Sequence, residues 1–196
     1  MFRPLFAPIM VIGLFAGTAL ADSSQRNMFA SVYLKGDKIG QVHLTTVRNE
    51  KGEVEKLKAN ASVSFLGMEV YGFTQNLKES WSSGELQEMD GKTDDNGTAH
   101  EIALTRNTED YKATYNGKEL TLPLNAFPTS PWHYAITENT LLFNIVDFEL
   151  LNGKSVEAEK FTFTGDWQAK LWFDKNRDFV KGEYDVSGRQ VTVILD

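Results

Sequence analysis

The sequence predicts an all-β protein, built as a single antiparallel, strongly curved sheet or a barrel-like meander with few or no helices. Three observations support this prediction. Apolar and polar residues alternate along several short segments, as in half-buried strands. Turn-forming residues recur between these segments at short intervals. No long segment has the apolar period of an amphipathic helix, and short strands with frequent turns are typical of curved or closed meanders.

The strands are predicted from alternation. Residues 57–65, LKANASVSF, place Leu, Ala, Val and Phe on one face and Lys, Asn and Ser on the other. Residues 167–173, WQAKLWF, place Trp167 with Ala169, Leu171 and Phe173, and residues 190–195, QVTVIL, repeat the pattern. Near the start, SVYL and QVHL form a pair around the turn KGDKIG. Each segment is therefore expected to bury one face.

The turns are predicted from Gly, Asn and Asp. YNGK, residues 115–118, is a two-residue hairpin, because Asn-Gly tolerates positive φ at both central positions. EKGE, DDNG, LNGK, DKNR and VSGR are expected to separate other strands. Residues 136–154 offer the best helical turn, in their first part only, and the remainder is expected to be strand. Residues 79–98 are expected to be strand ends joined by turns, with Gly84, Gly91 and Gly97 adopting conformations that other residues resist.

The segment NAFPTSPWHY, residues 125–134, interrupts the strand pattern. Pro128 and Pro131 exclude a central strand, because proline cannot donate a ladder hydrogen bond. We expect a long crossing loop that could serve as a lid or plug.

The first 21 residues have the features of a secretory signal peptide. A basic start at Arg3 precedes an apolar run, and small residues at Ala19 and Ala21 suit the peptidase. We therefore expect one β-rich domain over residues 22–196, in the periplasm or secreted, from a Gram-negative bacterium. The absence of Cys fits a periplasmic protein that needs no disulfide. No second apolar run is long enough to span a membrane.

Charge and motifs exclude several functions. The net charge of −7 argues against a nucleic-acid partner. No phosphate loop, dinucleotide fingerprint or spaced metal-ligand pair is present, so no cofactor or metal is expected. TDDNGT (93–98) and DKNRDFVKGEYD (174–185) superficially suit calcium. The first lacks the regular spacing and distant Glu of a calcium loop, and the second has Phe179 where a sharp turn needs Gly, so both are read as turns.

One predicted strand supplies most of the candidate site. Alternation puts on one face Tyr71, Phe73, Gln75, Leu77, Glu79 and Trp81. Glu79 on this apolar face is an acid, a base or a polar anchor in a cavity, unless a bulge near Ser80 turns it outward or an Arg or Lys pairs with it. The structural alternative is favoured. The candidate ligand-binding residues are Glu79, Gln75, Tyr71, Phe73, Trp81, Trp132 and His133.

Four segments carry a family resemblance. ESWSSGEL, TDDNGT, PTSPWH and the closing LWFDKNRDFVKGEYDVSGRQVTVIL resemble the exported bacterial family catalogued as domain of unknown function 6134. The resemblance covers most of the mature chain. It implies export and a β-rich fold, and it transfers no catalytic residue.

Three functions remain. The preferred one is a periplasmic binding or carrier protein for a hydrophobic or lipid-like ligand, because aromatic residues are plentiful and no catalytic motif is present. The second is an envelope accessory protein that docks a protein partner through residues 125–134. The third is a hydrolase that uses Glu79, assisted by His133, which would need a second carboxylate.

Overall fold

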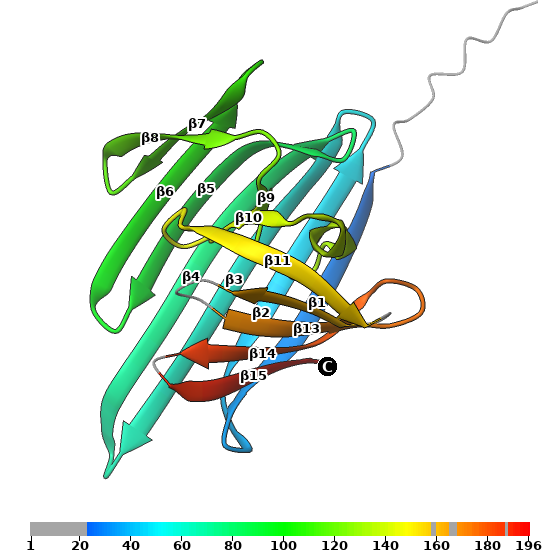
Figure 1. Cartoon of the computed structure of the whole chain (residues 1–196). Coiled ribbons are helices and arrows are strands. Elements are labelled where there is room, and N and C mark those ends of the chain that lie inside the picture. The colour runs from blue at the N-terminus through cyan, green and yellow to red at the C-terminus, as the bar shows by residue number, and fades with distance from the viewer. Residues whose placement is uncertain (1–22, 158–159, 165–167, 187) are drawn as a thin grey trace, which may run out of the picture.

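The computed structural model describes residues 23–157, 160–164, 168–186 and 188–196. The predicted signal peptide and Trp167 lie outside these residues. The described chain forms one fifteen-stranded sheet and a short 3-10 helix, η1 (Figure 1). The elements are β1 (Ser24–Leu34), β2 (Asp37–Asn49), β3 (Gly52–Phe65), β4 (Met68–Ser82), β5 (Glu85–Asp95), β6 (Thr98–Arg106), β7 (Asp110–Tyr115), β8 (Lys118–Pro123), β9 (Phe127–Pro128), η1 (Tyr134–Glu138), β10 (Leu141–Phe143), β11 (Leu150–Glu157), β12 (Lys160–Thr164), β13 (Gln168–Phe173), β14 (Phe179–Val186) and β15 (Arg189–Leu195).

The sheet order brings the two ends of the chain together. Strands run from β8 through β1, then from β15 back through β9, so β8 and β9 stand at the two ends of the order. β2 pairs with β1 from Ser24 to Leu34, whereas β15 pairs with it only from Ala30 to Leu34. Strands β11–β15 cross in front of the long strands β1–β6 (Figure 1). The predicted all-β, strongly curved fold is confirmed.

The hairpin turns follow the predicted chemistry. Asn116 and Gly117 have φ of 47° and 76°, the two positive values that a two-residue hairpin turn requires. In the β5–β6 turn, the Asp94 carboxylate accepts a hydrogen bond from the Gly97 backbone N–H at 2.7 Å. In the β13–β14 turn, the Asp174 carboxylate accepts from two backbone N–H groups, those of Asn176 and Asp178. Both calcium-like segments therefore use their Asp oxygens to close turns.

Two glycines differ from the prediction because they lie inside strands. Gly91 is in the middle of β5, where a Cβ atom would lie 2.8 Å from Ile102 Cγ1 and 3.0 Å from Leu77 Cδ1. Gly153, predicted to lie in the turn LNGK, is in β11, where a Cβ would lie 2.6 Å from Phe161 Cζ. Both glycines make room for core side chains, a role that turn chemistry alone does not reveal.

The segment from residue 125 to 154 is a crossing connection followed by short strands. β9 pairs in parallel with β10, which puts Pro128 on an edge strand, as expected for proline. η1 confirms the predicted helical turn, and β10 and β11 confirm the strand that follows it. Between these strands lies a turn whose residues 144–146 are all buried.

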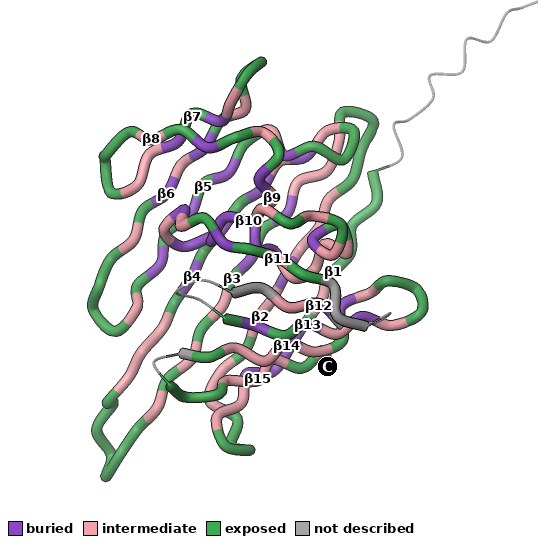
Figure 2. Tube along the Cα trace, viewed as in Figure 1, coloured by how far each residue is buried: buried purple, intermediate pink, exposed green. Residues whose placement is uncertain are grey.

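Buried side chains gather between the two layers of strands. Figure 2 shows buried positions along the long strands and in the segment that crosses them. One core cluster joins Leu77, Met89 and Leu104 of the long strands to Phe143 and Phe148 of the crossing segment. A second cluster includes Phe161, Leu171 and Phe173 of the C-terminal strands. Ala169, Leu171 and Phe173 are all buried, which confirms the alternation predicted for that strand.

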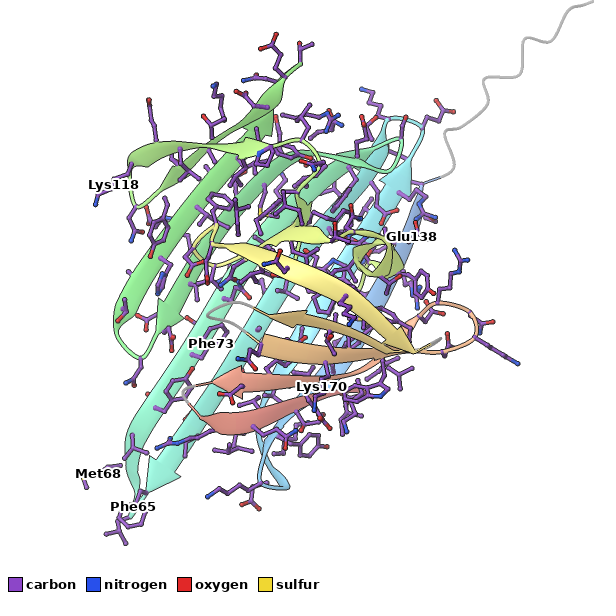
Figure 3. The ribbon with its side chains drawn as sticks, viewed as in Figure 1. Phe65, Met68, Phe73, Lys118, Glu138 and Lys170 are labelled. Carbon is purple, nitrogen blue, oxygen red and sulfur yellow. The ribbon has the colours of Figure 1, made fainter. Side chains whose placement is uncertain are left out.

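The tip of the β3–β4 hairpin is apolar and exposed. Phe65 is 64% exposed and Met68 is 64% exposed, and both side chains lie at the projecting end of the hairpin (Figure 3). The prediction that Phe65 joins the buried face of its strand is therefore wrong. The register shifts between Val63 and Ser64, and the strand beyond this irregularity has no layer in front of it to bury its face.

Candidate functional site

A cavity of about 180 Å³ lies on the inner face of the sheet, where the first strands, the last strands and the crossing segment meet. An engineered apolar cavity of about 150 Å³ stays dry and binds benzene, so this volume is large enough for a small hydrophobic group. The lining residues are Met28, Ala30, Val32, Ile39, Val42, Leu57, Ala59, Asn60, Ala61, Tyr71, Phe73, Gln75, Asp95, Thr129, Pro131, Trp132, Asn144, Ile145, Val146, Phe179, Tyr184, Val191 and Val193.

Four of the seven predicted site residues line this cavity: Tyr71, Phe73, Gln75 and Trp132. The first three come from one face of β4, as alternation predicts. Trp132 comes from the proline-containing loop of residues 125–134, which therefore covers part of the cavity as the expected lid or plug would. The other three predicted residues, Glu79, Trp81 and His133, do not line the cavity.

Polar groups in the cavity wall are few, and most have partners. Tyr71 makes a hydrogen bond with Asp95, and burial together with this carboxylate raises the pKa of the Tyr71 hydroxyl above its ordinary value. The Gln75 amide donates to the backbone carbonyl of Ile145 at 3.4 Å. The remaining wall is largely aliphatic and aromatic, which suits an apolar ligand.

Beside the cavity, Glu79 forms a buried polar cluster with a second carboxylate, Glu55. The two residues are direct partners across β3 and β4. Glu79 is only 1% exposed, although the β4–β5 register shifts next to it, between Ser80 and Trp81. The extra residue of this bulge is Gln87 on β5, so the alternation of β4 continues unbroken. The favoured prediction is wrong in both of its forms, because Glu79 is not turned outward and its charged partner is His133 instead of an Arg or Lys.

Each carboxylate receives hydrogen bonds from indole and hydroxyl groups. Glu79 accepts from the Ser130 hydroxyl and, at 3.1 Å, from Trp81 Nε1. Glu55 accepts from Trp132 Nε1 at 2.8 Å. Ser130 and Trp132, which flank Pro131 in the loop, thus face the two strands. Burial of a carboxylate is tolerated only with such partners.

His133 completes the cluster between the carboxylates. Its Nε2 lies 2.6 Å from Glu55 Oε2 and 3.6 Å from Glu79 Oε2. Burial lowers the pKa of His133, but the hydrogen bonds and negative charges of Glu55 and Glu79 outweigh it and raise the pKa to about 9. The imidazole is therefore protonated at neutral pH. Its positive charge offsets the repulsion between two carboxylates placed directly opposite each other.

Glu55, Glu79 and His133 also have the composition of a metal site. One donor atom of each lies within 4.8 Å of the other two. Yet the two carboxylates are already satisfied without a metal ion. Their partners are the His133 imidazolium, two indole N–H groups and the Ser130 hydroxyl. The donor set would fit a divalent ion only if His133 lost its proton. The arrangement present is an ion-paired anchor that fastens the loop to β3 and β4.

Sequence reasoning missed Glu55, Asn144 and the C-terminal wall of the cavity. A signal for Glu55 existed, because it has the same parity as Leu57 and Ala59 on the buried face of its strand. Turn chemistry alone would not have paired it with Glu79, because a hairpin centred on Leu66 and Gly67 puts Glu55 opposite Lys78, and the register shift between Val63 and Ser64 moves Glu79 into that place. Asn144 carried no such signal, because its burial depends on a turn packed beneath distant strands.

Comparison with known proteins supplies the family. The profile of a family described as "Domain of unknown function (DUF6134)" matches residues 31–196. The chain belongs to this family. The resemblance seen in the four sequence segments is thus confirmed for DUF6134. A comparison with curated proteins finds no match.

The fold of this DUF6134 chain is similar to that of a solved structure. The crystal structure of a beta-barrel-like protein of domain of unknown function DUF1849 from Brucella abortus matches with a TM-score of 0.59. The match covers 87% of this chain and 95% of that chain, at 10% sequence identity. Such low identity shows the fold alone. Among the described residues, no helix has the length and apolar character needed to cross a membrane.

Proposed function

We propose that the protein binds a hydrophobic or lipid-like ligand and acts as a carrier in the periplasm. The observation that supports this proposal best is the cavity on the inner face of the sheet, with its mostly aliphatic and aromatic wall. Four predicted ligand-binding residues contribute to that wall. A concave, mostly apolar surface with few polar groups is the usual form of a small-molecule site.

The two alternatives have less support. A hydrolase would need the Glu55–Glu79 pair to meet substrate, but Glu79 is fully buried and both carboxylates are held by loop residues. A docking loop would need exposed aromatic rings. Instead, Phe127 packs at 5.5 Å from the Trp81 ring, and the Trp132 indole donates to Glu55. The loop therefore faces the sheet.

Ligand binding can be tested by filling the cavity. Ala59 lines it from β3, whereas its neighbour Lys58 is exposed on the other face of the same strand. Octanoate and 1-octanol would be titrated by calorimetry into the mature protein and the variants Ala59→Phe and Lys58→Phe. We expect binding to the wild type and to Lys58→Phe, and at least tenfold weaker binding to Ala59→Phe. Equal affinity in all three proteins would place the ligand elsewhere, and no binding to the wild type would refute the proposal.

The location is part of the same proposal. The basic start, apolar run and small residues of positions 1–21 support export. Fractionation of cells that express the full chain would test it: the protein should appear in the periplasmic fraction, with an N-terminus at Asp22. A cytoplasmic protein that retains Met1 would contradict it.

A further inference from the structure

Among the residues that line the cavity, Asn144 has a fully buried side-chain polar atom without a partner. Asn144 is 1% exposed and lines the cavity, and its side-chain amide nitrogen, Nδ2, is the one buried side-chain polar atom without a hydrogen-bond partner among the residues that the structure describes. Buried donors are nearly always satisfied, because an unmet donor loses its bonds to water and gains nothing in return. An unsatisfied donor in a cavity wall therefore points to a missing acceptor.

The orientation of the Asn144 amide is fixed by its other end. Its Oδ1 accepts a hydrogen bond from the Val146 backbone N–H at 3.1 Å. Rotating the amide by half a turn would bring Nδ2, itself a donor, against that N–H donor and would break the bond. The amide nitrogen is therefore the free end.

The turn that carries Asn144 is held from several sides. The Asn144 backbone N–H donates to the Glu149 carbonyl, and the Phe148 N–H donates to the Asn144 carbonyl. Thr129 accepts from the Ile145 N–H, and Gln75 donates to the Ile145 carbonyl. These bonds fix the turn in place. The Nδ2 atom lies behind the surface of this largely apolar wall, with almost no accessible area of its own, so a ligand atom would reach it only by displacing a neighbouring side chain of the wall.

We propose that Asn144 Nδ2 donates a hydrogen bond to a carbonyl oxygen of the ligand, so that the cavity selects acyl compounds over apolar molecules without an acceptor. This inference rests on the proposed carrier function and specifies its ligand. The acyl chain lies against the aliphatic and aromatic wall, and the carbonyl of its ester or carboxylic acid group meets the amide.

Two ligands with the same eight-carbon chain test the inference. Methyl octanoate offers only hydrogen-bond acceptors, and octylammonium offers only donors. Both would be titrated into the wild type, Asn144→Asp and Asn60→Asp. Asn144→Asp keeps the oxygen that accepts from Val146 and removes the amide donor. Asn60→Asp makes the same chemical change at an exposed residue of the same cavity wall and is the matched control.

We expect Asn144→Asp to weaken methyl octanoate binding at least tenfold and to shift the preference toward octylammonium, since a lost partner for a buried polar group costs roughly a factor of ten. Asn60→Asp should stay within about twofold of the wild type. Equal binding of methyl octanoate by Asn144→Asp and the wild type would overturn the inference while leaving the carrier function standing. If neither ligand binds the wild type, both fail.

A second measurement uses the wild-type protein alone, so it does not depend on whether a variant folds. In a ¹H–¹⁵N spectrum of the wild type, the side-chain NH₂ signals of Asn144 should move downfield on addition of methyl octanoate. Unmoved Asn144 signals, together with shifted signals from Phe73 and Val193, would show that the chain enters the cavity without using the amide. In that case, a water molecule accepts the hydrogen bond of the Asn144 amide, and the inference is wrong.

Discussion

Glu55 and Glu79 are directly opposite each other across β3 and β4, and both carboxylates are buried. Such a like-charge pair is unfavourable in isolation. His133 makes it tolerable, because its imidazolium lies 2.6 Å from Glu55 and 3.6 Å from Glu79. The same loop also supplies Trp132 to the cavity wall. The cluster therefore holds in place the loop of residues 125–134, which covers part of the cavity.

Removing the imidazole should destabilise the protein strongly. His133→Ala leaves two opposed carboxylates in the interior without a positive charge, and we expect a loss of about 3–5 kcal/mol in the free energy of unfolding. Urea denaturation measures it. Adding Glu79→Gln to His133→Ala should recover part of the loss, because the repulsion is removed. If the two losses simply add, the residues do not interact.

Stability should fall at alkaline pH through His133. The folded state binds the imidazole proton more tightly, with a pKa of about 9 against 6.5 for the unfolded chain. The contribution is therefore complete below pH 6.5 and is lost as pH rises through 9, a change of about 3 kcal/mol. Urea midpoints at pH 6, 7.5 and 9.5 would follow it. In His133→Gln this loss of stability with rising pH should disappear. If the variant is as pH-sensitive as the wild type, groups other than His133 cause the loss.

Trp81 should contribute through both its ring and its indole nitrogen. The ring is buried 4.3 Å from the His133 ring, centroid to centroid, and Nε1 donates to Glu79. Trp81→Ala should cost about 3–5 kcal/mol of stability. Trp81→Phe keeps an aromatic ring and loses the donor, so a smaller cost of about 1–3 kcal/mol is expected. A Trp81→Phe variant as stable as the wild type in thermal denaturation would leave the hydrogen bond without measurable weight, and equal losses in the two variants would leave the ring without it.

Gly91 should resist substitution because of packing. An alanine Cβ would press on Ile102 Cγ1 at 2.8 Å, so Gly91→Ala should cost about 1–3 kcal/mol. Ile102→Ala in the same chain opens the space, and the double variant should then be more stable than the two separate losses imply. Additive losses in urea would show that the backbone conformation of Gly91, and not its contact with Ile102, determines the cost.

The sequence predicted the local features of the fold well. Alternation identified the inward face of β4 from Tyr71 to Trp81, and Asn116–Gly117 identified a hairpin turn, because both depend on neighbouring residues alone. Gly153 was misassigned to a turn because its role depends on Phe161, which approaches it from the next strand. Phe65 was misassigned because alternation tells which face a side chain takes and not whether anything covers that face.

The candidate site was predicted only in part, for the same reason. Gln75 and Trp132 reach the cavity as expected, since one lies on an apolar strand face and the other on an interrupting loop. Glu55 becomes a partner of Glu79 only through the β3–β4 register, and Asn144 is buried only because the chain folds back beneath strands formed far from it in sequence. Long-range contacts of this kind leave no local pattern.

The most direct measurement is native mass spectrometry of the mature protein purified from its own cells, followed by solvent extraction of any bound compound. The carrier account predicts a wild-type mass that exceeds the chain by a hydrophobic acyl compound, and an unmodified mass for Ala59→Phe, in which the cavity is filled. A wild type that carries no adduct and takes up neither octanoate nor methyl octanoate would contradict the account.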